Sequence, residues 1–262
     1  MPAGRFVLLD VALTEYSELD LPPDVAHQVR DVLRARPGDT IQLLDGRGAS
    51  YPAEVLTLER RHVVVRLGVR QERQQRTEPS CQVVLCQGML KVAKFEWVLQ
   101  KATELGVAAI QPLLTERAVA ATEMTGEARQ RRWQRILAEA LEQCGGDELP
   151  TLHTPHPLMH ALASLPERAI ALFPWEEADA APLRTTLVGA IAAAGGMTRV
   201  TEIRLFIGPE GGFSAGEAAL ASRHGALHVT LGARILRAET AALVATTLAL
   251  DAIGALDDAP LR

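Results

Sequence analysis

The chain has 262 residues, of which 48% are hydrophobic, 23% are charged and 4% are aromatic, and its formal net charge is −5. This apolar content is ordinary for a packed globular protein, so the composition excludes a disordered tail. The apolar runs are shorter than the roughly 20 residues that cross a bilayer, and the first residues resemble neither a signal peptide nor a transit peptide, so we expect no membrane partner. Three cysteines without a CxxC pair argue against a disulfide framework and favour a reducing, cytoplasmic location.

The charge is distributed unevenly along the chain. Residues 30–76 contain ten Arg and six acidic residues, whereas residues 1–29 and 81–262 each carry a net charge of −4. Arginine predominates among the cations, and its planar guanidinium suits phosphate oxygens and base edges. The local positive excess therefore permits a nucleic-acid contact despite the acidic total. A GC-rich coding sequence, which favours Arg codons, is the alternative explanation.

The first 76 residues have the pattern of short strands separated by turns. Residues 24–36 (DVAHQVRDVLRAR) predict a helix that places Val25, Val29, Val32 and Leu33 on one face. Several short strands and one helix in so short a segment predict a small β-barrel. The strand candidates are residues 5–13, 41–45, 51–59 and 62–69.

From residue 81 onward, apolar strands alternate with helices, and the polar segment 71–80 (QERQQRTEPS) has the composition of a linker before them. Continuous apolar strands that alternate with helices predict a parallel α/β sheet. The predicted strands are residues 81–88, 108–116, 167–176, 202–212 and 226–232, and the predicted helices are 94–106, 127–146 and 238–254.

A glycine-rich turn follows one of these strands, where residues 205–217 read LFIGPEGGFSAGE. Ser214 and Glu217 fit a capping box that starts a helix. Turns at the carboxyl ends of parallel strands are where open α/β sheets bind ligands, although a plain strand–turn–helix connection is the alternative. The pattern is neither GxGxxG nor a Walker loop, so it indicates neither a dinucleotide nor a nucleoside triphosphate. The glycines that permit a close backbone approach are Gly208, Gly211 and Gly212.

A second loop, residues 231–241 (LGARILRAETA), joins a strand to the last helix. Arg234, Arg237 and Glu239 lie there beside two apolar side chains, a mixture that suits a ligand with an apolar or adenine part and an anionic neighbour. Favourable pairing of an acidic residue with a helix N-terminus is the alternative explanation for Glu239.

Two further groups of residues bear on function. Arg129, Arg131, Arg132 and Arg135 surround Trp133 on one predicted helix, which allows either phosphate binding with base stacking or a solvated face with Trp in the core. The seven histidines form no HExxH motif, and those near residue 156 have no Cys partner, so we expect no metal. Cys144, beside two glycines, fits a helix-end residue better than a reactive thiol.

Four blocks, spread over nearly the whole chain, carry a resemblance to a known family. On these motifs the chain resembles the RsmE family, the small-subunit rRNA uridine-N3 methyltransferases of the SPOUT superfamily. The blocks are residues 27–39 with 45–46 and 51; 100–107 with 115–117; 132–143; and 207–214 with 231–241.

The resemblance implies both a fold and an activity. It implies a PUA-like β-barrel over residues 1–75 that binds RNA, and a SPOUT α/β domain over residues 80–262 with a parallel sheet and a trefoil knot. That knot would hold S-adenosylmethionine, and a homodimer would complete the site. The implied reaction is methylation of N3 of a specific uridine in 16S rRNA, in the decoding region of the small ribosomal subunit.

The resemblance also assigns roles to individual residues. Three loops, within 172–176, 208–212 and 231–241, would wrap the donor. Arg237 is the candidate for stabilising the uracil anion, and Glu239 and Glu210 are candidate bases. The RNA-contact candidates are Arg34, Lys91, Lys101, Arg117 and Arg132. The donor-binding candidates are Leu172, Phe173, Pro174, Gly208, Pro209, Glu210, Gly211, Gly212, Leu231, Gly232, Ile235, Leu236, Arg237, Thr240 and Ala241.

The sequence departs from the family pattern in three places. Residues 91–93 read KVA in place of Lys-Gly-Asp, residues 144–146 read CGG in place of Ser-Gly-Arg, and residues 118–121 read AVAA where polar or basic residues are common. These changes reduce the expected set of RNA contacts. Methylation of another RNA site or of a ribose hydroxyl, and a non-catalytic role as an RNA-binding assembly factor, are the alternative functions.

Overall fold

The structure is a computed structural model that describes residues 4–9, 11–60, 62–72, 81–118, 126–176 and 179–257. The chain divides into two compact units. The first unit comprises Met1–Arg76 and Ala138–Leu149, and the second comprises Thr77–Leu137 and Pro150–Arg262. A segment from the middle of the chain thus joins the N-terminal residues, while the limits of 1–75 and 80–262 stay predictions.

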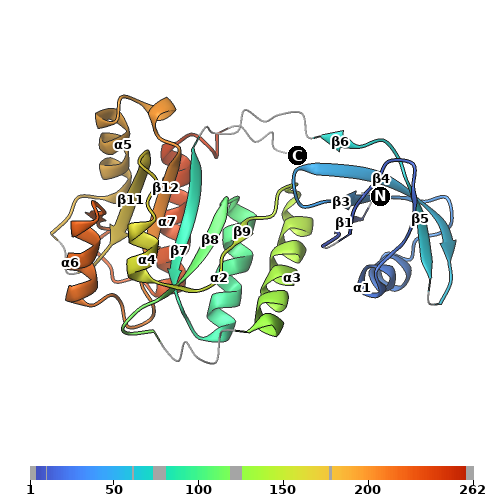
Figure 1. Cartoon of the computed structure of the whole chain (residues 1–262), viewed down its shortest axis with the longest axis horizontal. Coiled ribbons are helices and arrows are strands. Elements are labelled where there is room, and N and C mark those ends of the chain that lie inside the picture. Colours follow the sequence, from blue (N-terminus) through green and yellow to red (C-terminus); the bar gives the residue numbers. More distant parts are fainter. Residues whose placement is uncertain are drawn as a thin grey trace. The chain divides into compact units, whose positions relative to one another are not determined.

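The first unit is a small β domain (Figure 1). Its strands lie in the order β1-β3-β4-β5-β2, with β6 paired to β4; β1 and β3 are parallel and the other pairs are antiparallel. The short helix α1 continues into the π-helical turn η1. The elements are β1 (Arg5–Val7), β2 (Glu18–Asp20), α1 (Pro23–His27), η1 (Gln28–Val32), β3 (Thr40–Leu44), β4 (Ala49–Leu58), β5 (Val63–Leu67) and β6 (Gln71–Glu72).

The predicted apolar face of the first helix is only half correct. Val25 and Val29 are buried in the core of the β domain, but Val32 and Leu33 are 72% and 40% exposed. The backbone N–H of Leu33 donates to the carbonyl of Gln28, five residues earlier, so the last turn is wider than an α-helical turn. The wider turn rotates the later side chains away from the face that an α-helical period predicts.

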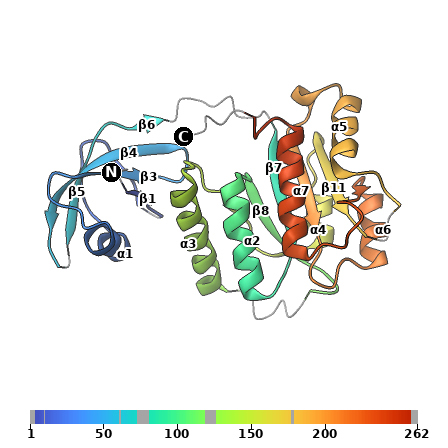
Figure 2. The ribbon, with the colours of Figure 1, turned by 180° about the vertical axis from the view of Figure 1, so that it is seen from behind.

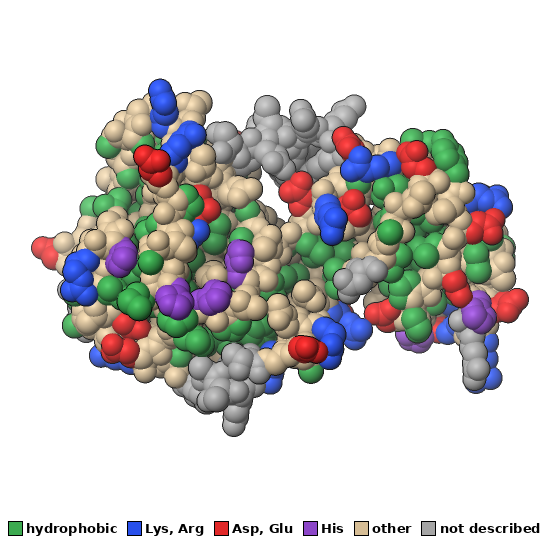
Figure 3. All heavy atoms as spheres, viewed as in Figure 1, with side chains coloured by type: hydrophobic (Ala, Val, Ile, Leu, Met, Phe, Trp, Pro, Cys, Tyr) green, Lys and Arg blue, Asp and Glu red, His purple; other side chains and the backbone are tan. Residues whose placement is uncertain are grey.

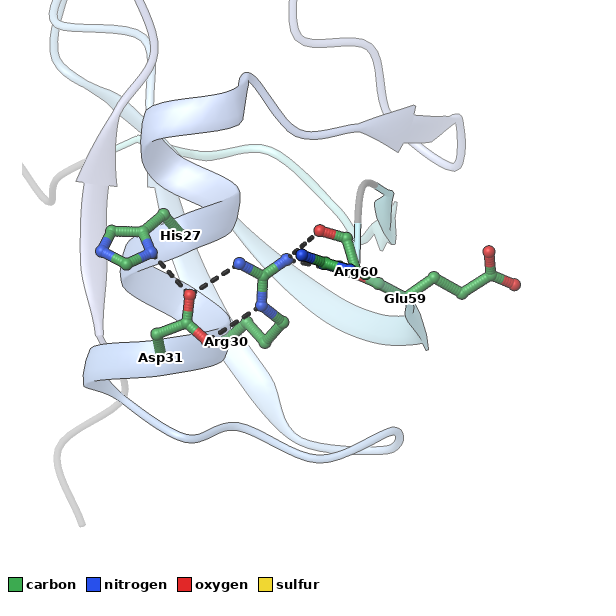
Figure 4. Close-up of polar contacts among 5 residues, drawn as sticks. All are labelled: His27, Arg30, Asp31, Glu59 and Arg60. Atoms are coloured by element: carbon green, nitrogen blue, oxygen red, sulfur yellow. Dashed lines mark hydrogen bonds and ion pairs between the residues drawn. The ribbon is translucent and has the colours of Figure 1, made fainter.

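An arginine attaches this helical segment to the loop between β4 and β5 (Figure 4). Arg30 Nη1 donates to the carbonyls of Arg60 (2.5 Å) and Glu59 (3.3 Å). Its Nη2 lies 2.6 Å from Asp31 Oδ2, which also lies 2.5 Å from His27 Nδ1. The hydrogen bond from Arg30 lowers the pKa of Asp31 to about 2. The Arg30 side chain therefore has a structural role, because it connects the helical segment to the loop between β4 and β5.

Residues 138–149 pack within the β domain. Arg5 pairs with Asp147 at 2.6 Å, and the Val7 N–H donates to Glu142 Oε1 at 2.7 Å. Burial raises the pKa of Glu142 above its ordinary value. Local sequence patterns give no sign of this packing, because the partners lie far apart in the chain. The apolar cluster beneath these contacts consists of Val7, Leu44, Ala138, Leu141 and Leu149.

The second unit contains the predicted parallel α/β sheet. Its strand pairs in the described part of the chain are parallel, and the strand order is β10-β8-β7-β12-β11-β13, with β9 paired to β8. The strands are β7 (Gln82–Gly88), β8 (Ala109–Leu114), β9 (Thr151–Leu152), β10 (His156–Pro157), β11 (Ala169–Pro174), β12 (Glu202–Ile207) and β13 (Leu227–Val229).

Helices cover both faces of this sheet (Figures 1 and 2). Helices α2 and α7 pack together on one face, and α4 and α6 contribute to the apolar cluster on the other. Helix α2 ends at Gly106 (φ +87°), as its sequence predicts. No helix in the described part of the chain is long and apolar enough to span a membrane. The helices are α2 (Val92–Leu105), α3 (Glu127–Cys144, whose residues from Ala138 onward belong to the first unit), α4 (Leu158–Ala163), α5 (Leu183–Ala193), η3 (Met197–Arg199), α6 (Ala215–Arg223) and α7 (Ala238–Ala252).

Candidate functional site

A pocket of about 540 Å³ lies in the second unit, where three strands end. Its walls are the segments that follow β11, β12 and β13, and these are the three loops that the sequence singles out. The carboxyl edge of a parallel sheet is the usual place for a ligand, because the loops there converge. The lining residues are Lys94, 174–176, 207–213, 229–238 and Ala241.

Most of the predicted donor-binding residues line this pocket, and three do not. Leu172 and Phe173 are fully buried within β11, and Thr240 is an exposed residue on the first turn of α7. Lys94 and Thr230 line the pocket without having been predicted. The predicted residues that line it are Pro174, Gly208, Pro209, Glu210, Gly211, Gly212, Leu231, Gly232, Ile235, Leu236, Arg237 and Ala241.

The glycine turn after β12 packs so tightly that side chains would not fit. A Cβ added to Gly88 at the end of β7 would lie 2.6 Å from the backbone nitrogen of Pro209. A Cβ on Gly208 would lie 3.2 Å from the nitrogen of Phe213, and Gly212 has φ +66°. The glycines thus allow the turn to fold back on itself against β7.

The loop after β8 holds this turn in place. Arg117 Nη1 donates to the carbonyls of Gly211 (3.2 Å) and Phe213 (3.3 Å). Glu217 accepts from the N–H of Glu116 and from that of Ser214, both at 2.9 Å, and Ser214 Oγ completes the predicted capping box at 3.1 Å. Arg117, predicted as an RNA contact, therefore also supports the pocket.

Three charged side chains form a cluster beside the pocket. Lys94 Nζ lies 3.5 Å from Glu210 Oε1 and 3.4 Å from Glu239 Oε2. Both carboxylates are candidate bases, and the backbone N–H of Lys91 donates to Glu210 at 3.3 Å. Arg237, the residue before α7, lines the pocket with an exposed side chain. Lys94, Glu210 and Arg237 thus line one cavity, whereas Glu239 lies behind Lys94 and is not among the lining residues.

The remaining RNA-contact candidates are exposed to different extents. Arg34 is exposed with φ +54°, a strained conformation for a residue with a side chain. Lys101 pairs with Glu104 at 2.8 Å, and Arg132 holds Glu96 with two hydrogen bonds of 2.6 and 2.8 Å.

Trp133 does not offer a stacking surface for a base. It is 2% exposed, and its ring lies 4.8 Å from that of Phe95 in the core. The core interpretation of this Trp is confirmed, because the ring is covered by α2. Of the three departures from the family pattern, most of the segment 118–121 lies outside the described residues. No group of His, Cys, Asp or Glu in the described ranges is arranged to hold a metal ion.

Comparison with known proteins agrees with this geometry. Family models match residues 77–250 as an RNA methyltransferase domain and residues 22–68 as an RNA methyltransferase PUA domain. The ribosomal RNA small subunit methyltransferase E of Synechocystis is 33% identical over 84% of this chain and 68% of its own length. That of Bacillus subtilis is 26% identical over 89% of this chain and 90% of its own.

Solved structures show the same likeness. The S-adenosylmethionine-bound small subunit methyltransferase E of Neisseria gonorrhoeae has a TM-score of 0.80 at 31% identity, covering 95% of this chain and 97% of that one. A cofactor-bound methyltransferase of Legionella pneumophila has a TM-score of 0.82 at 29% identity, covering 96% and 98%.

Fold and pocket together define an RNA methyltransferase that uses S-adenosylmethionine, so the predicted fold class, enzyme class and cofactor are confirmed. Within that class, the chain belongs to the ribosomal RNA small subunit methyltransferase E family, as the resemblance indicated.

The pocket residues fit the chemistry of that cofactor. Leu231, Ile235 and Leu236 offer apolar surface for an adenine, and Ile235 is 83% exposed, as expected of a side chain that a ligand covers. Glu176 and Glu210 offer negative charge for a sulfonium. The glycine turn brings backbone rather than side chains to the cavity. The donor-contact roles of the individual residues stay predictions.

Proposed function

We propose that this protein methylates N3 of one uridine in 16S rRNA, with the donor bound in the pocket between the three loops. The observation that carries the proposal is that these loops, chosen from the sequence, converge on one cavity at the carboxyl edge of the sheet. Two relatives, those of Synechocystis and Bacillus subtilis, are named ribosomal RNA small subunit methyltransferase E, which supports a small-subunit rRNA substrate.

The reaction makes specific demands on the residues around the pocket. When bound, S-adenosylmethionine supplies a methyl group on a positively charged sulfur. Uracil N3 must lose its proton to accept that group, so the site must favour the uracil anion. Arg237 lies at the N-terminus of α7, where its charge and the helix dipole both favour an anion. Glu239 and Glu210 are the candidates for accepting the proton.

The remaining assignments concern substrate and assembly. The β domain would bind the rRNA around the target, with Arg34 as one phosphate contact. The target base must leave its stack to reach the pocket, as other base-modifying enzymes require. We also propose a trefoil knot around the donor, a homodimer and a cytoplasmic location, where small ribosomal subunits are assembled.

Mapping the modification in rRNA tests the proposal. N3-methyluridine blocks Watson–Crick pairing, so reverse transcription of 16S rRNA should stop at one uridine when the gene is present and read through when it is deleted. A plasmid with the native gene should restore the stop. An unchanged stop after deletion, or a modification that appears on a ribose hydroxyl, would contradict the proposal.

A further inference from the structure

One lysine joins the glycine turn of the pocket to the first turn of α7. Lys94 lies on the first turn of α2, and its ammonium pairs with Glu210 at 3.5 Å and with Glu239 at 3.4 Å. Glu210 belongs to the glycine turn after β12, whereas Glu239 belongs to the first turn of α7. The contact therefore links three elements that are distant in the sequence.

The surroundings of Glu239 make this contact important for its position. The Glu239 side chain is 15% exposed, and its Oε2 atom is buried without a hydrogen-bond partner among the described residues. A buried carboxylate oxygen without a partner is costly, and an ion pair in such surroundings compensates for lost hydration. Without Lys94, Glu239 would lose this compensation and would repel Glu210.

We propose that Lys94 is a positioning residue that fixes the glycine turn relative to the start of α7 and so preforms the donor pocket. It acts through Glu210 and Glu239 and takes no part in bond making. The inference rests on the proposed function only in placing the donor in this pocket.

A positioning role and a charge-balancing role predict different ligand affinities. S-adenosylmethionine is cationic at sulfur, whereas its product S-adenosylhomocysteine is neutral there. If Lys94 only balanced charge, its removal would favour the cationic ligand over the neutral one. If it positions the pocket walls, its removal weakens both ligands alike.

Calorimetry on the full-length chain separates the two roles. Lys94→Met should weaken both ligands about tenfold, the equivalent of one lost charged contact, and keep the ratio of their affinities within about twofold. Lys94→Arg should retain most of the affinity. In a Glu210→Gln/Glu239→Gln background, Lys94→Met should have no further effect, because the partners through which it acts are neutral.

A matched control comes from the other end of α7. Arg184→Gln removes an ion pair with Asp251 (Nε to Oδ2, 2.9 Å), which lies away from the pocket lining, and should leave both affinities unchanged. Unchanged affinities in Lys94→Met, tighter binding of the cationic ligand alone, or an Arg variant no better than the Met variant would overturn the inference.

A second measurement needs no ligand. In the donor-free protein, amide hydrogen exchange in residues 208–213 and in the first turn of α7 should be faster in Lys94→Met than in the native chain, and unchanged in Arg184→Gln. Equal exchange in the native and Met variants would contradict a positioning role. If the native chain fails to methylate uridine N3 while these results hold, the proposed function fails and the role of Lys94 stands.

Discussion

Two arginines at the pocket of the second unit differ from the paired arginines of the β domain. In the β domain, Arg30 and Arg66 are held by acidic neighbours, and Arg5 is paired with Asp147. On the face that Figure 3 draws, basic and acidic side chains of this domain lie interspersed. In the second unit, Arg234 and Arg237 line the pocket with exposed side chains that have no ion pair within the described ranges.

The difference shows that the charge counted in the sequence is not the charge offered to a ligand. The excess of positive charge in residues 30–76 suggests a basic surface, but part of it is neutralised within the fold. The second unit nevertheless presents two guanidiniums beside its cavity. Exposed cations without partners are therefore the better guide to binding sites.

The largest expected effect follows from removing an unpaired cation at the pocket. Arg237→Ala should lower methyl transfer by about 10²–10³-fold, the usual loss of one donor to a developing anion. Donor affinity should stay nearly unchanged, because the anion arises on the base. Single-turnover transfer to rRNA and calorimetry with S-adenosylmethionine check both. Arg66→Gln, which removes a paired cation of the β domain, should change neither, and an equal loss in both variants would contradict the role of Arg237.

Within the β domain, Arg34, which has no ion pair among the described residues, can be compared directly with the paired Arg30. Arg34→Gly should weaken binding to 16S rRNA and reduce the slope of log affinity against log salt by about one, as expected for one phosphate contact. It should not lower stability, because Gly accepts the φ of +54° found there. Arg30→Gln should leave the salt slope unchanged, since Arg30 serves the fold. Equal salt slopes in both variants would show that Arg34 does not contact the RNA.

Local features of the second unit could be predicted from the sequence. The end of α2 at Gly106, the Ser214–Glu217 capping box and the pocket loops at 208–212 and 231–241 depend on residues close in the chain, whereas the loop at 172–176 came from the family resemblance. Apolar strands that alternate with helices indicate the parallel sheet for the same reason.

Features that depend on distant contacts could not be predicted. The pairing of Lys94 with Glu210 and Glu239 joins three elements, and a lysine on a helix gives no local sign of it. The packing of residues 138–149 with β1 is of the same kind. The turn at Gln28–Val32 is π-helical, although the spacing of its apolar residues matches that of an α-helix.

A paired arginine of the second unit gives a smaller effect. Arg132 holds Glu96 at 2.6 Å, and this contact lowers the pKa of Glu96 below its ordinary value. Because Arg132 is 64% exposed, Arg132→Gln should cost at most about 1 kcal/mol at neutral pH. Because the pKa of Glu96 is lower in the folded chain than in the unfolded chain, the ion pair stabilises the fold at a pH above the unfolded-state pKa. This stabilisation disappears as the pH falls through the folded-state pKa. Thermal unfolding from neutral to acidic pH measures it, and a loss of rRNA affinity as large as that of Arg34→Gly would mean that Arg132 also contacts RNA.

The smallest effect concerns His62 in the β domain, which carries a positive charge only at lower pH. His62 Nδ1 lies 2.6 Å from Asp20 Oδ2, and this hydrogen bond raises the pKa of His62 above 6.5. Because the pKa of His62 is higher in the folded chain, the contact stabilises the fold fully at a pH below the unfolded-state pKa of 6.5. This stabilisation is lost as the pH rises through the folded-state pKa. The Tm difference between the native chain and Asp20→Asn should therefore be larger near pH 6 than near pH 9, and the NMR titration midpoint of His62 should fall toward 6.5 in the variant.

Arg66→Gln provides the control for this titration. Arg66 on β5 pairs with Glu18 on β2, the strand that also carries Asp20, but a guanidinium stays charged throughout this range. Its Tm difference should thus be the same near pH 6 and near pH 9. If both variants show the same change with pH, the dependence comes from the domain as a whole. If only Asp20→Asn shows a pH-dependent Tm difference, His62 forms an ion pair with Asp20 below the pKa of His62 and loses that ion pair above it.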